Sequence, residues 1–124
     1  MKRNEAGVAA VEFALVLPIL LLLVLGIIEF SRAYNAQISL SAAAREGVRV
    51  MAIKNDSTEA KTATINAAPS LNPALATGDI VFSPATCVAG AAVTITAEYN
   101  FEFITGLFGG GMTLTGEGVM QCGG

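Results

Sequence analysis

The first quarter of the chain is a nearly continuous run of apolar residues. Residues 8–28 as an α-helix extend about 30 Å, which matches the hydrocarbon core of a bilayer. Lys2 and Arg3 precede the run, and Glu29 and Arg32 follow it. The bases on the N-terminal side favour a cytoplasmic N-terminus and an exported C-terminal part. The pattern therefore predicts one membrane-spanning helix.

Beyond this run, a partly apolar helical stripe covers residues 29–53. Its members recur at three- and four-residue steps: Ile27, Phe30, Tyr34, Ile38, Ser41, Arg45 and Val48. Many other residues of this stretch are small and permit close packing: Ala33, Ala36, Ser39, Ser41, Ala42, Ala43 and Ala44. Together with the apolar run, the stripe predicts one helix of roughly 70 Å, half in lipid and half packed on a domain or on neighbouring subunits.

Proline and capping residues mark where the helical pattern bends or ends. Pro18 removes one helix hydrogen bond, so we expect a kink or local unwinding over residues 14–18. Asp56 or Ser57 is expected to cap a second helix that ends near Ala68. An irregular connector then reaches Gly78.

The last third of the chain alternates between apolar and polar residues. The alternation is regular over residues 93–103, and shorter stretches at 79–83 and 112–122 predict further strands. Three successive strands would form an antiparallel meander with one apolar face, covered by the second helix and the outer half of the first. The predicted fold class is therefore α+β, with a long N-terminal membrane helix, a second helix and a three-stranded antiparallel sheet.

The two cysteines fall at the ends of predicted strands. In a meander, the ends of the first and third strands lie at the same edge, so Cys87 and Cys122 are expected to meet. In an exported domain they would form one disulfide, which stabilises a loop of this length by roughly 3–4 kcal/mol. A metal site is disfavoured because the chain has no His and no further Cys.

The remaining composition argues against catalysis and nucleic-acid binding. The net charge is −3 and no basic cluster is present. Glu98 and Glu102 share a strand face but stand about 13 Å apart, too far for a glycosidase carboxylate pair. The glycine-rich segment 106–111 is interpreted as a flexible hairpin connection. The lesser alternative is that Leu107 and Phe108 form a contact point for a partner subunit or the membrane surface. We expect no enzyme activity, no cofactor, no metal and no small-molecule substrate.

Gly7 and Glu12 stand five residues apart where the apolar run begins. A carboxylate costs roughly 2.5 kcal/mol or more at the bilayer centre, so it calls for a reason. A removable secretory signal is disfavoured because the core is too long and residues 26–29 offer no small-x-small site. A plain signal anchor leaves Glu12 unexplained. A prepilin-type leader, cut after Gly7 so that Val8 becomes the N-terminus, explains both residues.

Three segments resemble the TadE/TadG-like family, which comprises pseudopilins or minor pilins of the tight-adherence, Flp-type pilus. They read AAVEFALVLP at 9–18, GIIEFSRAY at 26–34 and AAREG at 43–47. The resemblance implies cleavage by a membrane aspartic prepilin peptidase, for which the candidate processing residues are Gly7, Val8, Glu12 and Phe13. The expected organisation is a leader (1–7), a transmembrane helix (8–28), the outer half of the helix (29–54) and an exported domain (55–124).

The resemblance also implies a way in which subunits assemble. Glu12 would pair with the N-terminal amine of a neighbouring subunit, so that each buried charge compensates the other. Glu29 and Arg32 are interpreted either as an exposed pair at the lipid boundary, worth at most about 1 kcal/mol, or as a subunit contact.

The implied location is the bacterial inner membrane, with the C-terminal domain in the periplasm and possible entry of the chain into an extracellular pilus. The implied partners are the membrane, the prepilin peptidase, other pilins or pseudopilins and pilus assembly proteins. The alternative is an uncleaved, membrane-anchored periplasmic interaction module.

Overall fold

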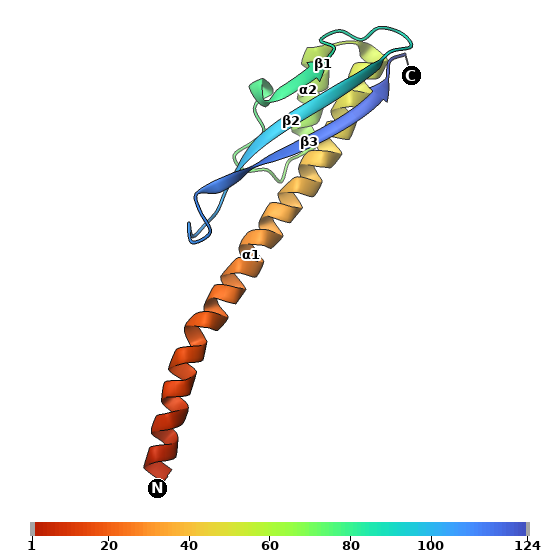
Figure 1. Ribbon diagram of the computed structural model, residues 1–124. Helices are drawn as coiled ribbons and strands as arrows, with labels where there is room; N and C mark the ends of the chain where they lie inside the picture. Colours follow the sequence, from red (N-terminus) through yellow and green to blue (C-terminus); the bar gives the residue numbers. More distant parts are fainter. Residues whose placement is uncertain (1, 124) are drawn as a thin grey trace. The chain divides into compact units, whose positions relative to one another are not determined.

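The computed structural model describes residues 2–123, with side chains from Glu5 onward, so the basic side chains of Lys2 and Arg3 lie outside the described part. Two helices precede a short 3-10 turn and three strands (Figure 1). The elements are α1 (Lys2–Lys54), α2 (Ser57–Asn66), η1 (Thr77–Asp79), β1 (Ile80–Ser83), β2 (Ala92–Glu102) and β3 (Gly111–Gln121). The α+β prediction is confirmed. Contacts group the chain into two compact units, residues 1–32 and residues 33–124.

The first unit consists of the N-terminal part of α1. The helix runs without interruption through Pro18, so the expected local unwinding over residues 14–18 does not occur. Side chains of residues 5–24 are all exposed. An 18-residue window of this helix has a mean hydropathy of 2.9, and none of the window is buried. In the described part of the chain, α1 is the one helix long and apolar enough to cross a membrane.

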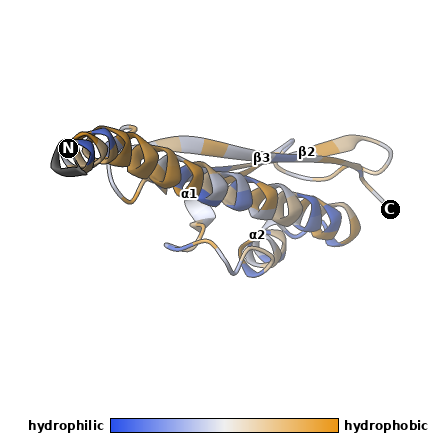
Figure 2. Cartoon of the chain, turned by 90° about the horizontal axis from the view of Figure 1, so that it is seen from below, coloured by the Kyte–Doolittle hydropathy of each residue, from blue (hydrophilic) through white to orange (hydrophobic). Residues whose placement is uncertain are grey.

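In the second unit, the sheet is a meander in the order β1-β2-β3, as predicted. The strands pair antiparallel, with Phe82 opposite Ile95 and Ile95 opposite Gly118. The alternation of β2 places its apolar residues inward, and these are Val93, Ile95, Ala97, Tyr99 and Phe101. The outer half of α1 and α2 lie on the same side of the sheet (Figures 1 and 2). One face is thus core and the other is solvated.

The buried face of α1 differs from the predicted stripe. Tyr34 and Ile38 are 70% and 51% exposed, so this part of the stripe does not pack on the folded unit of the same chain. Its packing on neighbouring subunits stays a prediction. The core face consists mostly of small side chains, with three larger ones: Ala33, Ala36, Leu40, Ala43, Ala44, Val48, Met51 and Ala52. Small side chains allow the helix backbone to approach the sheet closely, and size therefore decided the packing face more than hydrophobicity did.

Glycines on β3 complete this close approach. A Cβ at Gly116 would lie 2.7 Å from the Leu40 carbonyl oxygen, and a Cβ at Gly118 would lie 3.2 Å from the Ala44 carbonyl oxygen. Both contacts are with the helix backbone, which cannot move aside as a flexible side chain can. Helix and strand therefore meet backbone to backbone.

The connection from α1 to α2 follows the predicted capping. Asp56 caps α2 by accepting hydrogen bonds from the backbone N–H groups of Thr58 and Glu59, at 3.0 and 3.1 Å. Asn55 ends α1 with a φ of 50°, a left-handed conformation that Asn tolerates better than most residues. The Lys54 ammonium donates to the Glu59 carboxylate, and this hydrogen bond and charge raise the pKa of Lys54.

Candidate functional site

The glycine at the proposed cleavage point has no packing role in the described structure. Gly7 lies inside α1, and a Cβ added there would meet no atom within 4 Å. Glycine in a helix interior costs about 1 kcal/mol relative to alanine. Neither helix stability nor packing within this chain explains why residue 7 is glycine. A requirement imposed by another molecule is compatible with this.

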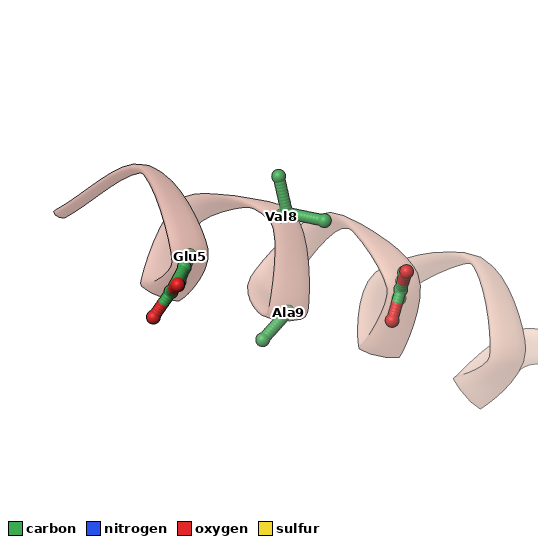
Figure 3. Close-up of a pocket in the computed structure, with 4 residues that line it drawn as sticks. Glu5, Val8 and Ala9 are labelled. Carbon is green, nitrogen blue, oxygen red and sulfur yellow. The ribbon is translucent and has the colours of Figure 1, made fainter. Parts of the chain in front are cut away.

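Residues on both sides of the proposed cleavage point share one face of α1. Glu5, Val8, Ala9 and Glu12 line a shallow, open hollow on the surface of α1 (Figure 3). Val8 and Glu12 are one turn apart, so the two residues lie on the same side of the helix. If the chain is cut after Gly7, the new amine and the carboxylate lie on a common face.

The apolar part of α1 around this site is solvent-exposed on every side. Glu12 is exposed, Val8 and Phe13 are 58% and 66% exposed, and the same holds for the following two turns. A helix that is apolar all round is stable when lipid or other protein covers it. The site therefore requires a surrounding that this chain does not itself supply.

Glu29 and Arg32 differ in their environments. Only 1% of the Glu29 surface is exposed, whereas Arg32 is exposed. The interpretation of the two as an exposed pair is therefore wrong for Glu29. A covered side chain offers little surface to a neighbouring subunit, so Arg32 is the better placed of the two for such a contact, which stays a proposal.

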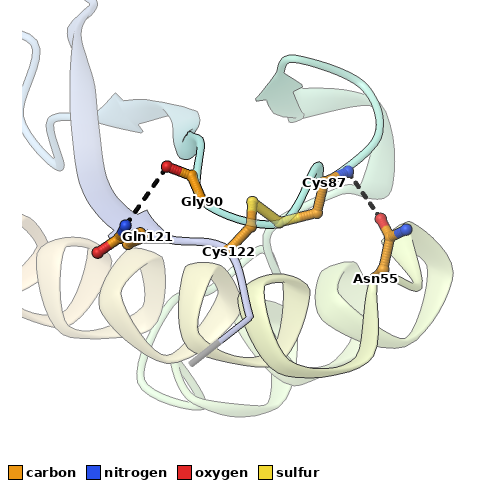
Figure 4. The surroundings of a disulfide bond; sticks show 5 residues. All are labelled: Asn55, Cys87, Gly90, Gln121 and Cys122. Atoms are coloured by element: carbon orange, nitrogen blue, oxygen red, sulfur yellow. Dashed lines mark hydrogen bonds between the residues drawn. A yellow bond between two sulfur atoms is a disulfide. The ribbon is translucent and has the colours of Figure 1, made fainter.

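The cysteines meet at the end of the second unit, as the meander predicted. Cys87 and Cys122 form a disulfide with a Cα–Cα distance of 5.7 Å, and the bond closes a segment with a sequence separation of 35 (Figure 4). The Gln121 side-chain amide donates to the Gly90 carbonyl at 3.3 Å, and the Cys122 backbone N–H donates to the Ala91 carbonyl at 2.8 Å. The disulfide and these hydrogen bonds thereby connect the β1–β2 connection to the end of β3.

Two hydrogen bonds connect the same region to the end of α1, and the sequence did not predict either of them. The Asn55 side-chain oxygen accepts a hydrogen bond from the Cys87 backbone N–H at 2.7 Å (Figure 4). The Gly123 backbone N–H donates to the Ala52 carbonyl at 3.0 Å. Asn55 was recognisable as a helix-ending residue, but its partner 32 positions away was not.

The two acidic residues considered for catalysis lie on the solvent-exposed face of the sheet. Glu98 and Glu102 are exposed on the outer face of β2. In the described part of the chain, no group of three or more His, Cys, Asp or Glu side chains is arranged to hold a metal ion. Arg45, Glu46 and Arg49 are exposed on the outer half of α1.

Comparison with known proteins gives a family match to the helical segment that contains Gly7 and Glu12. The family model with the description TadE-like protein matches residues 7–49, from Gly7 through the outer half of α1. No curated protein and no solved structure matches the chain. Residues 7–49 are therefore similar to TadE-like proteins, in agreement with the resemblance that the sequence motifs indicated.

Proposed function

We propose that this chain is a pseudopilin-like or minor-pilin-like membrane protein that takes part in assembling a tight-adherence, type IV-related pilus. One observation carries the proposal: the TadE-like match begins at Gly7, includes Glu12, and lies on a helix whose apolar surface the chain leaves uncovered. A helix of this kind suits insertion into a bilayer first and packing against other pilin-like helices afterwards.

The proposed topology is a single pass through the bacterial inner membrane, with the N-terminus in the cytoplasm and residues 33–124 in the periplasm. Lys2 and Arg3 before the apolar run support this orientation. The Cys87–Cys122 disulfide supports it independently, because disulfides persist in the oxidising periplasm and are rare in the cytosol.

In the proposed maturation, a prepilin peptidase cuts the peptide bond after Gly7 and leaves Val8 with a free α-amine. Glu12 then pairs with the Val8 amine of a neighbouring subunit. Either charge alone in an apolar surrounding is costly, so the pair favours assembled over separate subunits. Phe13 and the residues around it provide the apolar surface that the peptidase and the neighbouring helices contact.

The folded unit of residues 33–124 favours a minor or assembly role over that of a bare filament subunit. Sheared pili test this part of the proposal: co-sedimentation of the chain with the pili identifies a filament component. Loss of pili on deletion of the chain, with the chain confined to the membrane fraction, identifies an assembly factor. Normal piliation in the deletion strain contradicts the proposed function.

A further inference from the structure

The connection between β2 and β3 presents a small apolar surface. Ile104, Leu107 and Phe108 are 66%, 57% and 43% exposed, and Met112 at the start of β3 is 43% exposed. Residues 103–116 include no charged side chain. Exposed apolar side chains this close together in the sequence suit a contact surface for proteins or membranes. We refer to residues 103–110 as the β2–β3 loop.

Hydrogen bonds within the second unit show at which end this loop lies. The Gln37 side-chain amide donates to the Thr115 carbonyl at 2.8 Å, and Gly123 bonds to Ala52. Along β3, the direction from Gly123 back to Thr115 therefore follows α1 from Ala52 back to Gln37. The β2–β3 loop lies farther along in that direction, at the end of the unit where the chain leads into its apolar segment.

Covalent connection limits how far the start of the second unit can lie from a bilayer that holds the apolar segment. Ala33 begins the second unit and Ile28 ends the apolar run. Five residues span at most about 17 Å even when fully extended. Such a short tether gives the loop a high effective concentration at the membrane surface, so a weak interaction suffices.

We propose that the β2–β3 loop inserts its apolar side chains into the boundary between lipid headgroups and acyl chains. This inference rests on the membrane anchoring in the proposed function. Phe and Leu side chains suit this boundary, where apolar faces sink about 5–10 Å below the surface. Positive φ angles at Gly106 (71°) and Gly109 (108°) form the turns that present them.

The outer strand face favours apolar contact over attraction to anionic lipid. Glu98, Glu102 and Glu117 are exposed there. The loop itself offers no base with which to recognise an acidic headgroup. The interaction is therefore expected with zwitterionic phosphatidylcholine and should not need anionic lipid.

Because the chain contains no Trp, a single introduced Trp reports its own surroundings. The full chain is placed as a single copy in phosphatidylcholine nanodiscs whose acyl chains carry bromine, a contact quencher. Three variants are compared: Leu107→Trp in the loop, Val119→Trp on the outer sheet face, and Leu23→Trp in the apolar run. Val119 is 60% exposed and provides the matched control, while Leu23 reports anchoring alone.

The proposal predicts quenching at position 107 roughly threefold or more above that at position 119, because only the loop reaches the acyl boundary. Equal, weak quenching at 107 and 119 with strong quenching at 23 overturns the loop proposal and leaves the anchoring intact. Weak quenching at 23 overturns both. Shielding of position 107 from aqueous iodide without bromine quenching means that protein covers the loop, which also contradicts the proposal.

Discussion

Two glycines of α1, Gly7 and Gly47, differ in whether packing within the chain explains them. A Cβ at Gly47 would lie 1.9 Å from the Thr64 hydroxyl oxygen and 2.8 Å from the Ile95 terminal methyl carbon, so packing demands glycine there. At Gly7, no contact in the described structure requires glycine. Packing within the chain explains Gly47 but not Gly7. Under the proposed function, the requirement for Gly7 comes from the prepilin peptidase.

Gly7→Leu is predicted to block processing and to leave residues 33–124 folded. The added side chain enters open space in the monomer but must fit the site of a peptidase that cuts after position 7. The intact mass of the membrane-extracted protein should then include residues 1–7. Ala10→Leu, which adds similar bulk to an exposed position one turn later, is the control and should still be processed. Normal processing of Gly7→Leu contradicts the assignment.

Glu12→Ala is predicted to permit membrane insertion but to reduce piliation strongly, because an unpaired α-amine is left among apolar helices. Counting pili and measuring membrane-bound chain checks both parts. Glu5→Ala is the matched control: Glu5 lies on the same helix face but is removed with the leader. Wild-type piliation in the Glu12 variant, or equal loss in both variants, contradicts the pairing.

At the scale of elements, alternation and capping signals were sufficient for most of the second unit. Strands β1 to β3 and the Asp56 cap follow from local patterns, since a period of two and a capping carboxylate are local physical requirements. The packing face of α1 did not follow. Alanines and the distant Gly116 and Gly118 define it together. Of the predicted stripe, Val48 is buried in this face, whereas Tyr34 and Ile38 are exposed.

Gly116→Ala is predicted to destabilise the second unit by about 1–3 kcal/mol, because the new methyl group would press on the α1 backbone at Leu40. Thermal unfolding, followed by circular dichroism in detergent, measures the change. Gly110→Ala is the control, since a Cβ there meets nothing within 4 Å. Equal stability of the two variants would mean that helix and sheet do not approach as closely as described.

Replacing both cysteines with serine is predicted to lower the free energy of unfolding by roughly 3–4 kcal/mol, because the open chain regains loop entropy. Denaturant unfolding of the oxidised protein, the reduced protein and the Cys87→Ser/Cys122→Ser variant measures this. The reduced protein should resemble the variant. Two free thiols in protein isolated from the periplasmic face would show that the bond does not form in the cell.

At the scale of the whole molecule, the chain combines an uncovered apolar helix with a folded unit that has its own core and disulfide. The TadE-like match covers the helix and stops at residue 49, so the sheet stands outside it. The membrane segment and the motifs before it could be read from sequence because bilayer thickness and charge cost impose them. The partners of the sheet could not be predicted from the sequence, because the residues of an exposed surface say little about which molecule contacts it.

The N-terminal residue of the mature protein tests the central claim most directly. The protein is expressed in its own host, extracted from the membrane and from sheared pili, and subjected to N-terminal sequencing. The account predicts Val8 as the first residue in every fraction that contains the chain. A chain that still begins at Met1 in the membrane and is absent from the pili contradicts it, and would identify an uncleaved, anchored interaction module.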